Sequence, residues 1–123
     1  MPYAIVLTVV LIALAVFQLA LACGAPWGRF AWGGQHRVLP AQLRVGSVVS
    51  ILIYALIALV AWDRVGAVGL LPDAFAVVAM WVIFGYFVLG IVMNAISRSK
   101  PERYTMVPVV TVLAVLSLFI ALG

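Results

Sequence analysis

The sequence has 123 residues, of which 68% are hydrophobic and 8% are charged, and its formal net charge is +4. Soluble domains contain about half apolar and about a quarter charged residues, so this composition excludes a water-exposed surface over most of the molecule. We therefore expect one domain, residues 1–123, that is surrounded mainly by lipid.

Four apolar segments are long enough to cross a bilayer, because about 20 helical residues span a hydrocarbon layer of about 30 Å. Each segment lacks Asp, Glu, Lys, Arg and His, and none shows the alternating pattern of a barrel strand. The N-terminus has no basic segment typical of a cleaved signal, so we expect the first helix to be retained. The sequence thus predicts an all-α, four-helix transmembrane bundle with spans at residues 3–22, 45–62, 74–96 and 106–122.

Basic residues are unevenly distributed between the predicted connections. With four spans, residues 23–44 and 97–105 lie on the same side of the membrane, whereas both termini and the connection around Arg64 lie on the other side. The positive-inside rule places the more basic side in the cytoplasm and both termini outside. The positive charge then faces anionic lipid headgroups, and we expect no nucleic-acid partner. The basic residues of the two cytoplasmic connections are Arg29, Arg37, Arg44, Arg98, Lys100 and Arg103.

The first connection contains the segment CGAPWGRFAWGGQHRVLP, residues 23–40. Its glycines and prolines favour tight turns, and its aromatic side chains are too apolar to remain in water. We expect the segment to fold back against the membrane surface or into the mouth of the bundle. The simpler hypothesis is an interfacial cap whose cations bind lipid phosphate, and the alternative is a ligand-binding lid. The candidate headgroup- or ligand-binding residues are Trp27, Arg29, Trp32, His36 and Arg37.

Polar side chains are rare inside the predicted spans, so their positions are informative. Helical spacing places three of them on one face of the second span and two on one face of the third, while another lies near the cytoplasmic end of the first. We expect them to meet beneath the first connection. They would either form interhelical hydrogen bonds, each contributing about 0.6 kcal/mol, or line a shallow cavity that opens to the cytoplasm. This candidate intramembrane cluster comprises Gln18, Ser47, Ser50, Tyr54, Tyr86 and Asn94.

Evidence for catalysis or metal binding is weak. His36 and Cys23 are separated by flexible chain, and no neighbouring carboxylate would orient the imidazole. One histidine, one cysteine and three carboxylates form no metal-ligand spacing, so we expect no catalytic residue, no metal and no cofactor. The spans also lack the intramembrane carboxylate that coupled carriers usually need. A passive channel formed by several copies remains an alternative.

The second connection is compact, and Glu102 is expected to neutralise part of the charge of its basic neighbours. Together, GAPWG and WGGQ in the first connection and SRSKPER in the second resemble a group of small, uncharacterised bacterial four-span membrane proteins. The resemblance implies a bacterial inner (plasma) membrane and nothing about chemistry.

We predict an integral membrane binding or accessory protein whose basic cytoplasmic face recognises anionic lipid headgroups, a small ligand or a partner protein. The alternative is an oligomeric channel or transporter for a small solute, and the expected partners are membrane lipids with either a second copy or another membrane protein.

Overall fold

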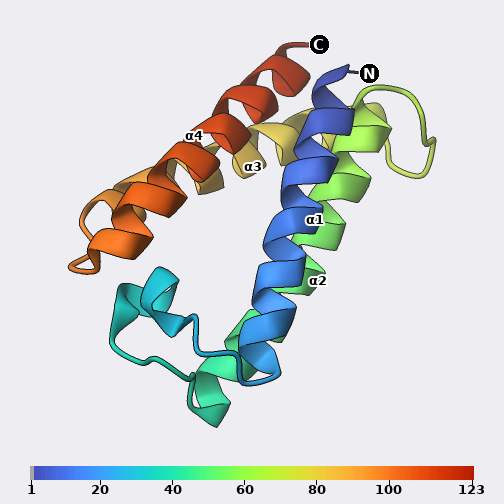
Figure 1. Cartoon of the computed structure of the whole chain (residues 1–123). Helices are drawn as coiled ribbons and strands as arrows, with labels where there is room; N and C mark the ends of the chain where they lie inside the picture. The colour runs from blue at the N-terminus through green and yellow to red at the C-terminus, as the bar shows by residue number, and fades with distance from the viewer. Residues whose placement is uncertain (1) are drawn as a thin grey trace.

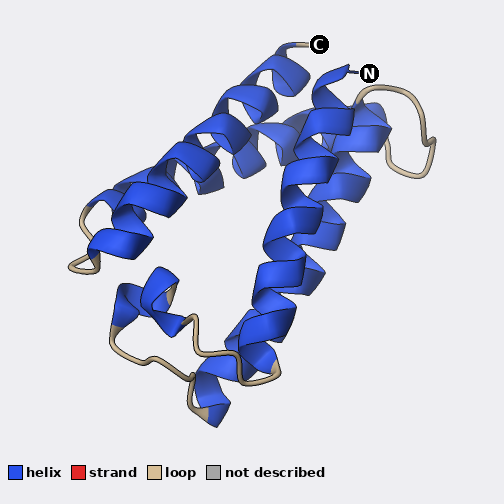
Figure 2. Ribbon diagram, viewed as in Figure 1, coloured by secondary structure: helices blue, strands red, loops and turns tan. Residues whose placement is uncertain are grey.

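The computed structural model describes residues 2–123, and in this part of the chain all regular structure is helical (Figure 2). The four main helices are each long and apolar enough to cross a membrane. The predicted all-α, four-helix architecture is therefore confirmed, and the chain is a multi-pass membrane protein. The elements are α1 (Pro2–Ala22), η1 (Gly28–Phe30), η2 (Trp32–Gly34), α2 (Ala41–Arg64), α3 (Asp73–Ala95) and α4 (Lys100–Leu122).

Two helices extend beyond the apolar segments that predicted them. Helix α2 begins at Ala41 rather than at residue 45, and α4 begins at Lys100 rather than at residue 106. Pro101 is compatible with this early start because the first turn of a helix needs no N–H partner there. Pro108 consequently lies inside α4, where it removes one backbone hydrogen bond. The charged first turn of α4 is thus helical although it is too polar for the hydrocarbon layer.

Glycine ends the first two long helices. Gly24 has a φ of +96°, a left-handed conformation that carries no side-chain penalty for glycine. The next residue, Ala25, donates its N–H to the carbonyl of Ala20 at 2.9 Å, which completes a Schellman cap on α1. Gly66, with a φ of +86°, occupies the equivalent position after α2. Both glycines therefore turn the chain where a helix must stop.

The helices form two antiparallel hairpins, α1 with α2 and α3 with α4, and packing within each hairpin is closer than packing between them. Figure 1 shows that the hairpins meet near the chain termini and diverge toward the opposite end, like the arms of a V. The termini and residues 65–72 lie at the closed end. Residues 23–40 and 96–99 lie at the open end, with η1 and η2 placed between the two arms.

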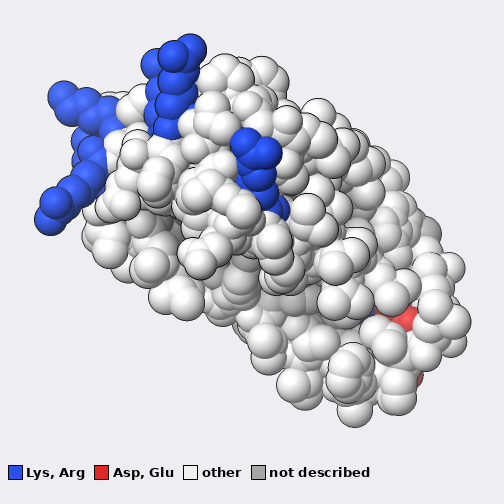
Figure 3. Space-filling view, turned by 90° about the horizontal axis from the view of Figure 1, so that it is seen from below, with Lys and Arg blue, Asp and Glu red and all other residues white. Residues whose placement is uncertain are grey.

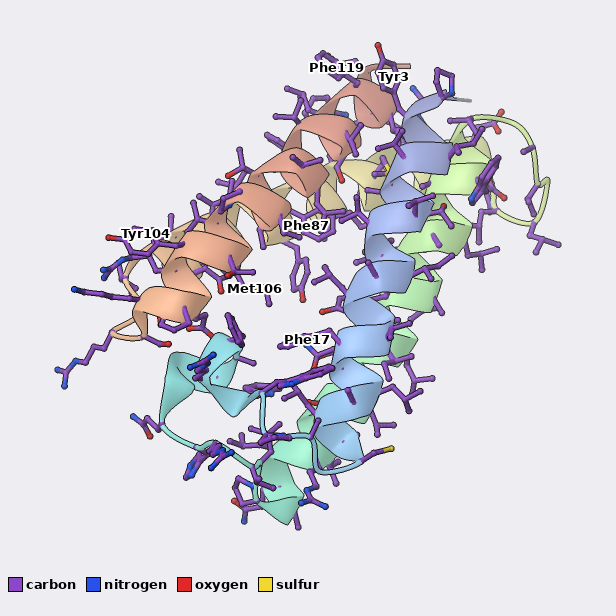
Figure 4. All side chains as sticks on the ribbon, in the orientation of Figure 1. Tyr3, Phe17, Phe87, Tyr104, Met106 and Phe119 are labelled. Carbon is purple, nitrogen blue, oxygen red and sulfur yellow. The ribbon has the colours of Figure 1, made fainter. Side chains whose placement is uncertain are left out.

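The closed end contains the main hydrophobic core. Many of its residues are alanines, and small side chains allow helices to approach closely in a membrane. Two polar contacts add to this packing: Trp62 Nε1 donates to Thr8 Oγ1 at 2.9 Å, and Arg64 Nη2 donates to the Ala121 carbonyl at 3.1 Å. Figure 4 also shows Tyr3 beside Phe119 at this end, with ring centroids 5.2 Å apart. The buried core residues are Ala4, Leu7, Leu11, Ile57, Ala61, Met80, Phe87, Leu113, Ala114, Ile120 and Ala121.

Candidate functional site

A cavity of about 690 Å³ lies between the two hairpins toward the open end; we call it the interior cavity. Its walls are mainly apolar, and Figure 4 shows Phe17 of α1, Phe87 of α3 and Met106 of α4 pointing into this space. The volume falls within the range of about 300–1,000 Å³ that is usual for small-molecule sites. The interior cavity is therefore large enough to hold a ligand.

Most of the predicted polar cluster lines this cavity. Ser47 is the exception: it is fully buried, and its Oγ accepts a hydrogen bond from Trp32 Nε1 at 3.4 Å. Ser47 thus secures the connection that follows α1 rather than facing the cavity. The predicted residues that the structure brings together are Gln18, Ser50, Tyr54, Tyr86 and Asn94.

The hydrogen bonds of this cluster are mostly local. Ser50 Oγ and Asn94 Nδ2 donate to carbonyls of their own helices, at 3.0 and 2.7 Å. Between helices, Gln18 Nε2 donates to the Tyr54 hydroxyl at 3.4 Å. The other amide atom, Gln18 Oε1, is buried and has no hydrogen-bond partner. The cluster therefore combines one interhelical hydrogen bond with a cavity wall that retains an unused acceptor.

Glu102 is a cavity residue that the sequence analysis did not identify. Its side chain is only 6% exposed, and its Oε2 accepts a hydrogen bond from the Gly33 N–H at 3.3 Å. The expected role was to neutralise neighbouring cations in the second connection. A signal was present in the spacing Ser99-x-x-Glu102, which is typical of a helix capping box. Ser99 Oγ does accept the Glu102 N–H at 3.4 Å, but the carboxylate contacts η2.

Residues 23–40, which we call the cap, lie in the mouth of the V and contact both hairpins. The Trp32 ring lies against Gly46 of α2, and Gly34 lies so close to Ser99 that an added Cβ would overlap it. Ser99 Oγ also donates to the carbonyl of Arg29. Trp32 has a φ of +52°, a left-handed conformation uncommon outside glycine. The cap is thus an ordered segment, and it occupies the bundle mouth rather than only the membrane surface.

The predicted headgroup-binding residues divide between two sides of the cap. Trp32 and His36 line the interior cavity. Trp27, Arg29 and Arg37 instead line an outward depression of about 520 Å³, together with two small residues; we call this the basic depression. Both arginines are exposed, and Figure 3 shows that Lys and Arg side chains gather on one part of the surface seen from below.

An apolar groove of about 620 Å³ lies between α1 and α4; we call it the lateral groove. Its floor and walls are almost entirely hydrocarbon, and Trp27 lines both this groove and the basic depression. An apolar surface and a cationic surface therefore meet at one tryptophan. The residues of the lateral groove are Val9, Val10, Ala13, Leu14, Phe17, Trp27, Phe30, Thr105, Met106 and Val109.

Within residues 2–123, no three His, Cys, Asp or Glu side chains are grouped closely enough to hold a metal ion. Cys23 is exposed and has no disulfide partner. Comparison with protein-family models, with curated proteins and with solved structures finds no match to the chain.

Proposed function

We propose that this multi-pass membrane protein binds an anionic phospholipid, with the phosphate in the basic depression and one acyl chain in the lateral groove. The observation that carries the proposal is the position of Trp27, which lines both surfaces. In a phospholipid the charged phosphate lies close to the hydrocarbon chains, just as the basic depression lies next to the lateral groove. Tryptophan also favours the membrane–water interface, where headgroup meets hydrocarbon, because its ring is apolar and its N–H is polar.

Arg29 and Arg37 supply the charge for headgroup recognition. A guanidinium group presents paired N–H donors that match the oxygens of a phosphate. The distribution of basic residues predicts that the depression faces the cytoplasmic leaflet, where anionic lipids are enriched. Each arginine near such a surface contributes about 1 kcal/mol, so the pair would contribute about thirtyfold in affinity.

Lipid retention by the two arginines can be tested in purified protein. We expect native mass spectrometry in mild detergent to show phosphatidylglycerol retained in preference to phosphatidylcholine. The double variant Arg29→Gln/Arg37→Gln should lose at least about tenfold in affinity for the anionic lipid. Arg98→Gln is the matched control, because Arg98 is exposed at the same end but does not line the depression. Equal retention by the double variant, or equal loss in the control, would contradict the proposal.

The acyl-chain half of the site has its own test. Ala13 lines the lateral groove and does not line the basic depression. Ala13→Trp should fill the groove and weaken retention of a two-chain phospholipid, while binding of a short water-soluble glycerophosphate at the arginines stays unchanged. If both ligands bind to the variant as before, the lateral groove does not hold the acyl chain.

The alternative is an oligomeric channel or transporter for a small solute, which the polar residues of the interior cavity favour. Within residues 2–123, a single copy offers no continuous pathway for a solute, because the hydrophobic core fills the closed end of the V. Transport would therefore require several copies around a shared axis. Solute flux in liposomes, together with a symmetric oligomer in native mass spectrometry, would make transport the better account.

A further inference from the structure

The interior cavity has an unbalanced charge. Glu102 lines it, and within residues 2–123 no lysine or arginine does; Arg29 and Arg37 line the basic depression on the other side of the cap. We infer that the interior cavity is a second binding site, for a lipophilic organic cation, with Glu102 as its counter-ion. This site adjoins the lateral groove of the proposed phospholipid site, but its charge comes from Glu102 rather than from Arg29 and Arg37, and it does not depend on phospholipid binding.

Glu102 is placed to receive a positive charge. Its side chain is 6% exposed, and it lies in the first turn of α4, where the helix dipole stabilises a carboxylate. A carboxylate offers about four acceptor positions, and Gly33 N–H occupies one of them. Burial reduces solvent screening, so the remaining capacity favours a cationic ligand more strongly than a surface carboxylate would.

One buried acceptor and several aromatic rings around the cavity favour the same kind of ligand. Gln18 is 9% exposed and lines the cavity, and its Oε1 is an acceptor without a partner. Aromatic faces attract cations within about 6 Å of the ring centroid. An acceptor, a carboxylate and several aromatic rings together complement a cation rather than an anion. The aromatic lining residues are Phe17, Phe30, Trp32, Tyr54, Tyr86 and Phe87.

The apolar lining indicates that the cation carries hydrocarbon. Phe17, Phe30 and Met106 line both the interior cavity and the lateral groove, so the two spaces adjoin. A ligand dissolved in the bilayer would therefore meet apolar wall first and the carboxylate later. The volume of about 690 Å³ accommodates an aromatic cation of drug size.

Two ions of the same shape and opposite charge make the test direct. We would measure tetraphenylphosphonium and, in separate titrations, tetraphenylborate, by equilibrium dialysis against protein in phosphatidylcholine nanodiscs, with empty nanodiscs subtracted. All titrations use the same buffer and the same pH. We expect saturable binding of the cation at one site per chain and no saturable binding of the anion. Saturable binding of both ions with equal affinity, or of neither, would overturn the inference.

Two substitutions test whether Glu102 is the counter-ion of the bound cation. Glu102→Gln keeps an oxygen for the Gly33 N–H but removes the charge, so cation affinity should fall at least about tenfold. Asp73→Asn is the matched control, since Asp73 is an exposed carboxylate in the first turn of α3, at the other end of the molecule. Unchanged affinity in Glu102→Gln, or an equal fall in Asp73→Asn, would overturn the assignment.

A second pair of variants tests the cation site without altering Glu102, whose side chain contacts the cap. Tyr86 lines the cavity from α3, and Tyr86→Leu removes its ring whereas Tyr86→Phe removes only its hydroxyl. The leucine variant should lose about threefold in cation affinity, and the phenylalanine variant should lose little. If Glu102→Gln failed to fold, equal affinity of the two Tyr86 variants would still refute a cation held by aromatic rings.

Discussion

The ring of Trp32 lies directly on Gly46, so closely that a Cβ at Gly46 would be 2.9 Å from two ring carbons. Only glycine permits this approach between the cap and α2. Trp32 Nε1 also reaches Ser47 Oγ, at 3.4 Å, and its backbone is in the left-handed region. Strained backbone persists where surrounding contacts maintain it, and here the contacts with α2 do so. Trp32 therefore holds the cap against α2 at a position where its ring also lines the interior cavity.

Gly46→Ala should displace the Trp32 ring without unfolding α2. Alanine is a better helix former than glycine, but its Cβ would occupy the position of the ring. We expect faster oxidation of Trp32 by N-bromosuccinimide, measured residue by residue with mass spectrometry. Gly85→Ala is the control, because a Cβ at Gly85 meets open space. An unchanged Trp32 oxidation rate in Gly46→Ala would show that the ring does not depend on this contact.

Gly34→Ala should detach the cap from α4. Gly34 and Gly33 both have positive φ, +72° and +78°, so alanine costs about 1 kcal/mol of backbone strain at either position. Only at Gly34 would the new Cβ overlap Ser99; at Gly33 it meets nothing within 4 Å. We expect Gly34→Ala to be cleaved faster by trypsin at Arg29 and Arg37 than Gly33→Ala. Similar cleavage of the two variants would mean that strain, and not docking on α4, governs the order of the cap.

Thr8→Val should destabilise the closed end by about 1 kcal/mol, because it removes the acceptor of the Trp62 indole N–H. Thr8 and Thr111 each donate to a carbonyl of their own helix, but Thr111 is exposed. Thr111→Val is therefore the matched control, and its free energy of unfolding should change little. The measurement is reversible unfolding in mixed micelles. Equal free-energy changes for the two variants would show that the Thr8–Trp62 hydrogen bond does not stabilise the closed end.

Membrane orientation can be tested with the single cysteine. Cys23 is exposed at the open end, which the positive-inside rule places in the cytoplasm. An impermeant maleimide added to intact cells should leave Cys23 unlabelled and should label it after lysis. The double variant Cys23→Ser/Ala67→Cys moves the thiol to an exposed residue at the opposite end, where intact cells should be labelled. The reverse pattern would invert the orientation and place the basic depression outside the cytoplasm.

Helical periodicity placed Ser50 and Tyr54 on one face of α2 and Tyr86 and Asn94 on one face of α3, and in the structure these four residues line the interior cavity. It could not separate Ser47 from Ser50, because both lie on neighbouring positions of the same face. What separates them is the Trp32 indole, which comes from another segment and bonds Ser47. Glu102 was missed for the same reason: its partner Gly33 is far away in the sequence.

The sequence by itself determined that the chain crosses a membrane as four helices, because the hydrophobicity of a segment is a local property that the bilayer selects directly. It also determined which connections are basic. Only the tertiary structure decided that the hairpins diverge, that the cap fills their mouth, and that one carboxylate enters the interior cavity while Arg29 and Arg37 remain outside it. These features depend on contacts between distant segments, and lipid is as apolar as the helix surfaces, so hydrophobicity alone cannot choose how the helices pack.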